Sequence, residues 1–82
     1  MVAKLKKVNL SEQVCRIIKQ KIVDKAWHAG FKLASESDLA DMFGVNRLTI
    51  RIALQKLNAL GILETKVGDG TYVTDFDLAK YM

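Results

Sequence analysis

The feature that most constrains this chain is a very short turn between two helical patterns. Gly44 and Val45 are the only residues between Phe43, where one amphipathic run ends, and Asn46, a good N-cap for the next. Glycine readily adopts the left-handed conformation that ends a helix. Because so short a turn holds two helices close together, the sequence predicts a helix-turn-helix.

Cap signals set the bounds of these two helices. Ser35 and Asp38 form a Ser-x-x-Asp cap, so the first helix of the pair is predicted to start at Ser35. The second is predicted from Arg47 to about Leu60, where a glycine follows. Its apolar face, which should turn to the core, consists of Ile50, Ala53, Leu54, Leu57 and Leu60.

The stretch before this pair predicts another helix. Asn9 is followed three residues later by Glu12, as in a capping box, and apolar residues then recur at helical spacing. This helix is predicted from Leu10 to about Ala26. Its apolar stripe comprises Leu10, Val14, Ile17, Ile18 and Ile22.

The stretch after Gly61 has the period of a β-hairpin. Residues 62–67 and 71–74 are rich in alternating and β-branched side chains, and they flank a glycine-rich loop at 68–70. The alternating run 31–33 is a candidate strand beside this hairpin. The predicted fold is therefore α+β and mainly α: a winged helix-turn-helix with three helices plus a small antiparallel β-hairpin wing.

Composition supports one small domain. Half of the 82 residues are hydrophobic, and Cys15 is the single cysteine, so no internal disulfide can form. No uninterrupted apolar stretch suits a signal peptide or a membrane span. We therefore expect a cytoplasmic protein without membrane association. Residues 10–74 would form the domain, residues 1–9 a basic N-terminal segment and residues 75–82 a linker.

Positive charge is concentrated in two zones. The net charge is +4, yet residues 1–25 contain seven Lys/Arg against two acids, whereas the remaining residues contain six against seven. Within that remainder, the segment 46–60 has three basic residues and no acid. A helix that enters a DNA groove needs such an outward face, because it lies among phosphates and base edges.

This acid-free segment carries the side chains of a DNA-recognition helix. Arg47, Arg51 and Gln55 are four residues apart on one exposed stripe, with Thr49 in the first turn. Arg can fork onto guanine, Gln can pair with adenine, and Thr can bond a phosphate or touch a thymine methyl. Asn46 can both cap the helix and contact DNA. The sequence predicts sequence-specific binding of double-stranded DNA, with this helix in the major groove.

Leu48 interrupts the polar face of that helix. Like Ile52 it lies off the core stripe, so Leu48 at least is expected to be partly exposed. Contact with a thymine methyl and packing against the preceding helix or the wing both fit the pattern, and the sequence leaves the two alternatives open.

The predicted wing, residues 62–74, is expected to lie near the minor groove. Gly68 and Gly70 permit a tight turn and a close approach of the backbone to a phosphate. The acidic residue between them is unfavourable beside phosphates. Lys66, Thr71 and backbone N–H groups are therefore the expected wing contacts.

Four motifs lie within residues 30–73: Leu33-x-Ser35-Glu36-x-x-Leu39-Ala40, Val45-x-Arg47-x-Thr49-Ile50-Arg51, Leu57-x-x-x-Gly61 and Gly68-x-Gly70-Thr71-x-Val73. Through these motifs the segment resembles the DNA-binding domain of the GntR family of bacterial transcription regulators. The resemblance implies a homodimer in the full-length protein, which binds a palindromic operator through an N-terminal winged domain. It also implies a C-terminal domain for a small-molecule effector, absent from this chain, towards which residues 75–82 would lead.

The same resemblance implies roles for individual residues. It assigns base and phosphate contacts to Arg47 and Arg51, a phosphate contact to Thr49 and the wing contact to Gly68. Asn46 holds a position that is usually Ser or Thr.

Three departures from the family pattern bear on binding. Ala34 stands where the family often has Pro, Ser37 where an Arg commonly contacts DNA, and Asp69 where a basic wing residue is more usual. Ser37 is kept as a candidate contact, although it lacks the charge. The recognition helix is therefore expected to carry more of the DNA recognition than it usually does.

Two other functional classes fit the sequence less well. An enzyme is disfavoured because the chain offers only His28 and Cys15, without a phosphate loop or a set of metal ligands, so no cofactor is expected. The stronger alternative is a winged-helix protein-interaction module without DNA binding, since a fold does not fix its function. The residues do not distinguish a repressor from an activator.

Overall fold

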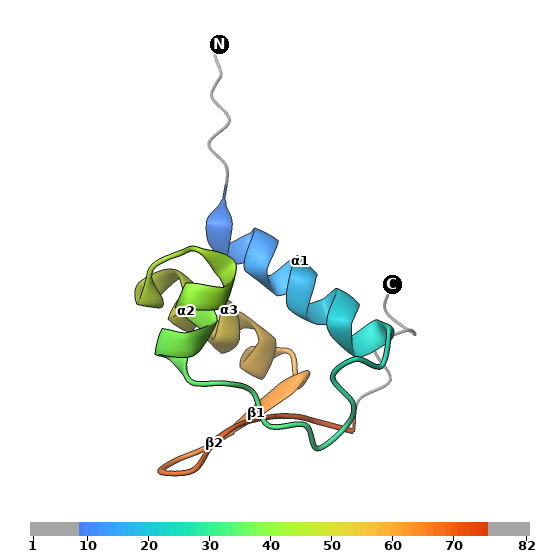
Figure 1. Ribbon diagram of the computed structural model, residues 1–82. Helices are drawn as coiled ribbons and strands as arrows, with labels where there is room; N and C mark the ends of the chain where they lie inside the picture. The colour runs from blue at the N-terminus through green and yellow to red at the C-terminus, as the bar shows by residue number, and fades with distance from the viewer. Residues whose placement is uncertain (1–8, 76–82) are drawn as a thin grey trace.

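Residues 9–75, the part of the chain that this computed structural model describes, form three helices and one hairpin (Figure 1). The predicted winged helix-turn-helix is confirmed. Of the predicted terminal segments, residues 1–8 and 76–82 lie outside the described residues. The elements are α1 (Leu10–Val23), α2 (Glu36–Phe43), α3 (Arg47–Ala59), β1 (Leu63–Lys66) and β2 (Gly70–Val73).

Each helix begins at the N-cap that the sequence predicted. The side chains of Asn9, Ser35 and Asn46 accept hydrogen bonds from the backbone N–H three residues further on, at 3.2, 3.1 and 2.8 Å. Each bond satisfies one of the N–H groups that a helix start leaves without an internal partner. These local bonds explain why the starts of the helices were predictable.

The predicted end of α1 was wrong by three residues. The helix ends at Val23 and not near Ala26, because Lys25 adopts a left-handed conformation with φ of 66° that an α-helix cannot contain. The N–H of Trp27 then donates to the carbonyl of Lys21 at 3.1 Å, and the Trp27 side chain is buried. The chain thus turns back towards the core before it reaches the run 31–33.

The turn between α2 and α3 is as short as predicted. Gly44 has φ of 68°, and the Val45 N–H reaches across it to the Ala40 carbonyl at 3.0 Å. Because this bond satisfies a carbonyl at the end of α2, the helix can stop abruptly. The next helix begins three residues after Gly44, and α3 packs against α2.

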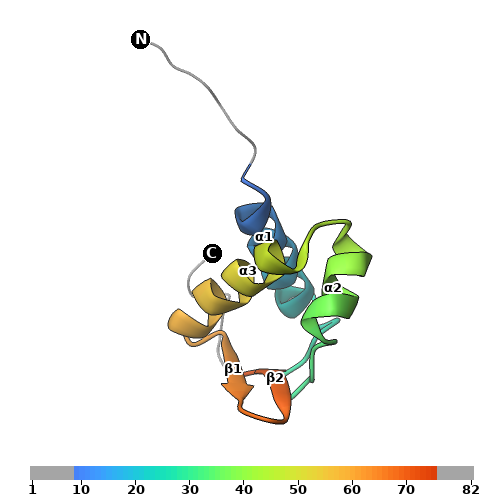
Figure 2. The same cartoon turned by 90° about the vertical axis from the view of Figure 1, so that its left-hand side faces the viewer.

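All the described elements share one core. Helices α1 and α2 both pack on α3, and α3 packs on β1 (Figure 2). Cys15 lies in this core, where its thiol donates to the Ala53 carbonyl at 3.5 Å. Among residues 9–75, no helix has the length and apolar composition needed to cross a bilayer. The largest fully buried side chains are Ile18, Leu39, Ile50, Leu57 and Leu63.

The hairpin loop lies one residue earlier than predicted. Gly70 pairs with Lys66 and so belongs to β2, which leaves residues 67–69 as the loop. The Asp69 N–H donates to the Lys66 carbonyl at 2.9 Å, and Gly68, the third residue of this four-residue turn, has φ of 79°. A type II turn requires a positive φ at that position, which explains the glycine.

The run 31–33 does lie beside the hairpin, as predicted. Lys32 forms an antiparallel bridge with Tyr72, and the Leu33 N–H donates to the Thr71 carbonyl at 2.8 Å. The pairing remains a single bridge because the cap of α2 follows at Ser35. It joins the start of the helix-turn-helix to β2, so the hairpin and α2 are held together.

Candidate nucleic-acid interface

The predicted cationic stripe is present at the start of α3. The side chains of Arg47 and Arg51 are 64% and 49% exposed, and Gln55 is exposed one turn further along. Thr49 is half-buried. Since the helix contains no acid, its outward side is positively charged.

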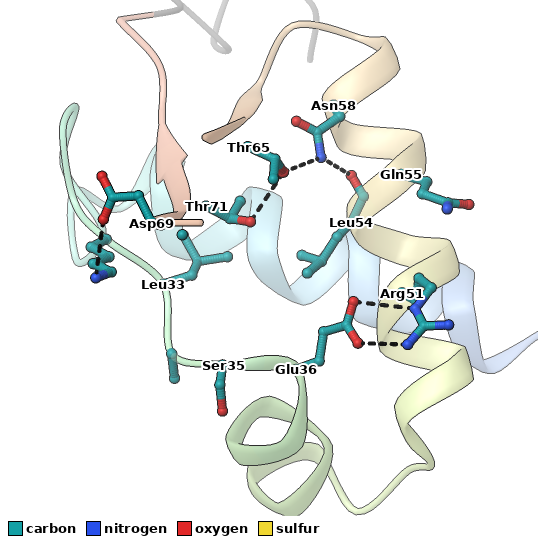
Figure 3. Close-up of a pocket in the computed structure, with 13 residues that line it drawn as sticks. Leu33, Ser35, Glu36, Arg51, Leu54, Gln55, Asn58, Thr65, Asp69 and Thr71 are labelled. Carbon is teal, nitrogen blue, oxygen red and sulfur yellow. Dashed lines mark hydrogen bonds and ion pairs between the residues drawn. The ribbon is translucent and has the colours of Figure 1, made fainter. Parts of the chain in front are cut away.

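Glu36, the first residue of α2, binds both arginines. Arg51 donates from Nε and Nη2 to the two carboxylate oxygens at 3.3 and 3.1 Å (Figure 3). Arg47 Nη2 lies 4.0 Å from one of these oxygens. The hydrogen bonds from Arg51, then the charges of the two arginines, hold the pKa of Glu36 below its ordinary value. A two-bonded fork fixes the plane of a guanidinium. Arg51 is therefore oriented before any ligand arrives.

A groove separates α3 from the hairpin (Figure 3). It encloses about 640 Å³, and the segment 32–36 joins its two sides. The α3 side consists of Arg51, Leu54, Gln55 and Asn58, and the hairpin side of Thr65, Asp69, Gly70 and Thr71.

A chain of hydrogen bonds links α3 to the hairpin. Asn58 Nδ2 donates to the Leu54 carbonyl at 2.9 Å and to the Thr65 hydroxyl at 3.0 Å. The Thr65 and Thr71 hydroxyls share a further bond of 3.1 Å (Figure 3). Thr71, a predicted DNA contact, is thus half-buried and already bonded within the protein. Together these hydrogen bonds fix the angle between α3 and the hairpin.

The acidic residue at the tip of the hairpin is surrounded by cations. Asp69 accepts hydrogen bonds from the Tyr72 hydroxyl at 2.9 Å and from Lys32 Nζ at 3.5 Å. Lys66 Nζ lies 4.9 Å from the centroid of the Tyr72 ring. The hydrogen bond from Tyr72, and next that from Lys32, lower the pKa of Asp69. Two lysines around one carboxylate leave this tip with net positive charge.

Of the two predicted wing glycines, Gly68 has the stronger structural reason to be glycine. A Cβ on Gly70 would come within 2.7 Å of Lys32 Cε, but this atom is near the end of a flexible side chain that can shift. Gly68 is exposed in the turn, where its positive φ disfavours other residues.

The remaining predicted contacts lie on or beside the two helices. Ser37 is exposed in the first turn of α2, and Asn46 is exposed while its side chain caps α3. Leu48 is 60% exposed. That exposure argues against the alternative in which Leu48 packs on α2 or on the hairpin.

Comparison with known proteins gives the family. The family model described as bacterial regulatory proteins, gntR family, matches residues 10–73. This chain belongs to the gntR family. The match includes all three helices and both strands of the hairpin, so the fold and the candidate interface lie within the family domain.

Curated relatives of this gntR-family chain are regulators of transcription. YisV of Bacillus subtilis, an uncharacterized HTH-type transcriptional regulator, is 41% identical over 68 residues, which are 83% of this chain and 14% of that protein. LutR of the same organism is 47% identical over 49 residues, which are 60% of this chain and 22% of that protein. The chain thus spans 14% and 22% of the length of these two relatives.

Solved structures show the same fold. The DNA-binding domain of AraR in complex with operator ORR3 is 30% identical, with a TM-score of 0.79 over 90% of this chain and 89% of that chain. A transcriptional regulator from Oenococcus oeni is 25% identical, with a TM-score of 0.84 over 96% and 65%. Residues 10–73 therefore form a winged helix-turn-helix DNA-binding domain of the gntR type.

Three polar residues of this gntR-family interface escaped the sequence analysis. Glu36 was named only as part of a family motif, Lys32 fell only within a candidate strand, and Asn58 was given no role. Their partners lie 15, 37 and 7 residues away in sequence. The one available signal was the alternating run 31–33, which placed Lys32 beside the hairpin.

Proposed function

We propose that this domain binds a specific double-stranded operator, with the start of α3 in the major groove and the hairpin near the minor groove. The observation that carries the proposal is the exposed pair Arg47 and Arg51 at the start of a helix without acids, in which Glu36 orients Arg51 through two hydrogen bonds. The AraR domain, whose fold matches over 90% of this chain, was solved with its operator, which supports the proposal.

The first two turns of α3 supply most of the recognition. Arg47 and Arg51 bind guanine edges or phosphates, and Gln55 binds adenine. Thr49 bonds a phosphate, and Asn46 lies beside the helix N-terminus, where N–H groups favour an anion. An Arg51 that is already oriented loses less side-chain entropy on binding, which favours a defined contact over a diffuse one.

The hairpin and α2 supply the outer contacts. Lys66, Thr71 and the backbone at Gly68 and Gly70 lie against the phosphates or the minor groove, and Lys32 joins them because it lies beside the same tip. Ser37 contributes a hydroxyl contact from the first turn of α2. These contacts position the domain without reading the sequence directly.

The whole regulator acts by binding and not by catalysis, in the cytoplasm, where its operator lies. It forms a homodimer on a palindromic site and responds to a small-molecule effector bound by a C-terminal domain. The much greater length of the relatives supports a further domain. Two linked half-sites also give the affinity that a single small interface lacks.

The test is selection of bound sequences from random duplexes with the full chain, and with the dimeric regulator. The affinity of the selected duplex is then measured by fluorescence anisotropy over a range of salt concentrations. Arg51→Ala should weaken binding by about tenfold or more, and affinity should fall steeply as salt rises.

Arg16→Ala is the matched control. Arg16 is exposed on α1 and is not one of the proposed contacts, so this variant removes the same charge from outside the proposed contact set. If Arg16→Ala and Arg51→Ala lower the affinity for the selected duplex equally, the binding is explained by general charge attraction. No binding of any duplex at low salt by the dimer would contradict the proposal and favour a protein-interaction module.

A further inference from the structure

The outermost face of α3 carries two apolar residues beside the polar Gln55. At 3.6 residues per turn, Leu48 and Ile52 lie on the side opposite the buried residues of the helix, and they are neighbours because they are four positions apart. Leu48 is 60% exposed and Ile52 is 37% exposed. Two adjacent branched apolar side chains at the centre of a proposed DNA-reading face need a partner of matching chemistry.

Charged groups border this apolar pair on both flanks. On the α2 side, Arg47 and Arg51 are turned towards Glu36. On the α1 side, Lys56 lies 3.9 Å from Glu12. The face is thus an apolar centre between cations, and the same helix has no acid of its own. Phosphates of a groove would meet the cations while the floor of the groove meets the apolar pair.

The floor of the major groove holds one apolar group. Among the base edges there, only thymine presents a methyl, while the other groups are hydrogen-bond donors and acceptors. We propose that Leu48 and Ile52 read thymine methyl groups, so that the operator of this protein carries thymines beside the bases that the arginines bind. The inference rests on the proposed DNA binding and names which bases the centre of α3 selects.

The spacing of the two side chains limits where those thymines lie. Four residues advance about 6 Å along a helix, and two base-pair steps advance about 7 Å along the duplex. A helix that lies along the groove therefore brings the two side chains to methyls about two base pairs apart. The selected sequences should show two preferred thymines at about that separation in each half-site.

The experiment replaces single thymines by deoxyuridine in the selected duplex. This change removes the methyl and leaves the pairing and the phosphates intact. At each of the two thymines, the affinity of the full chain should fall about fourfold, following about 0.8 kcal/mol per buried CH₂. Uracil at other positions should leave the affinity unchanged.

Two variants assign the methyls to their readers. Leu48→Ala should bind the thymine and uracil duplexes equally at one position, and Ile52→Ala at the other, because the reading side chain is gone. Leu60→Ala is the matched control. Leu60 was predicted to turn to the core, but it follows the last residue of α3 and is 57% exposed. It borders a groove with α1, so this variant should keep both responses to uracil.

The outcomes separate this inference from the function on which it rests. Tight binding of a selected duplex with no response to uracil at any position overturns methyl reading and leaves operator binding intact. A response to uracil that persists in both Leu48→Ala and Ile52→Ala also overturns it, because another group then reads the methyls. Failure to bind any duplex contradicts the proposed function, and the inference falls with it.

Discussion

The guanidinium of Arg51 on α3 forks onto the carboxylate of Glu36 on α2, with N–O distances of 3.3 and 3.1 Å. For a protein proposed to bind DNA, this pair has two opposed effects. The negative charge of Glu36 opposes attraction to any duplex. The two hydrogen bonds, however, fix the orientation of the Arg51 guanidinium. A fixed orientation strengthens binding only to a duplex that has the matching base edges. The two effects can be separated by comparing a selected duplex with an unrelated one.

Glu36→Gln should therefore weaken discrimination while it raises general affinity. The amide removes the charge and offers one acceptor in place of two, so Arg51 is no longer held in one plane. We expect tighter binding of an unrelated duplex and a fall of about tenfold in the ratio of selected to unrelated affinity. Fluorescence anisotropy with both duplexes at two salt concentrations measures that ratio.

Asp38→Asn is the control for that experiment. Asp38 is an exposed acid in the same first turn of α2, and its charge is not bonded to an arginine in the described structure. Its loss should raise the affinity for both duplexes equally and leave the ratio unchanged. If Glu36→Gln behaves like Asp38→Asn, Glu36 acts through its charge alone and does not position Arg51.

The hydrogen bond between Tyr72 and Asp69 predicts a pH window for the stability of the hairpin. Chiefly through this bond, the pKa of Asp69 is lowered from its ordinary 3.8 and that of Tyr72 is raised from its ordinary 10.0. A lowered acid pKa gives stabilisation that is complete above 3.8 and is lost as the pH falls through the folded value. A raised tyrosine pKa gives stabilisation that is complete below 10.0 and is lost as the pH rises through the folded value.

Tyr72→Phe removes this bond and keeps the ring beside Lys66. The thermal midpoint of the variant should lie slightly below that of the parent, by a constant amount between about pH 5 and about pH 9. The gap should close towards both extremes. A gap that does not narrow when the pH falls far enough to protonate Asp69 in the folded protein would mean that the hydroxyl does not act through the Asp69 carboxylate.

The starts of the helices could be predicted because their causes are local. Ser35 and Asn46 cap α2 and α3 through bonds to residues only three positions away. The end of α1 could not, since Lys25 adopts a left-handed conformation without the glycine that usually marks one. Within the site, helical period predicted that Arg51 is exposed. Its bond to Glu36 was not predictable, because spacing rules do not reach across two helices.

The left-handed residue in the turn between α2 and α3 predicts a stability effect without a steric one. A Cβ on Gly44 would meet no atom within 4 Å, but its φ of 68° is unfavourable for other residues. Gly44→Ala should lower the free energy of unfolding by about 1 kcal/mol, and Gly44→Asn by less, because Asn tolerates this conformation. Urea unfolding followed by circular dichroism measures both. Equal losses for Ala and Asn would point to a cause other than backbone conformation.

Cys15 provides a probe of core opening. The thiol is buried between α1 and α3, and burial raises its pKa, so both access and the fraction of thiolate are low. Alkylation should thus require unfolding. Ile50→Val, at a fully buried position of α3, costs about 1 kcal/mol and should speed labelling about fivefold, whereas Leu60→Ala at an exposed position should not. If Cys15 is labelled rapidly and Ile50→Val does not change the rate, α1 detaches locally while the rest of the core stays folded.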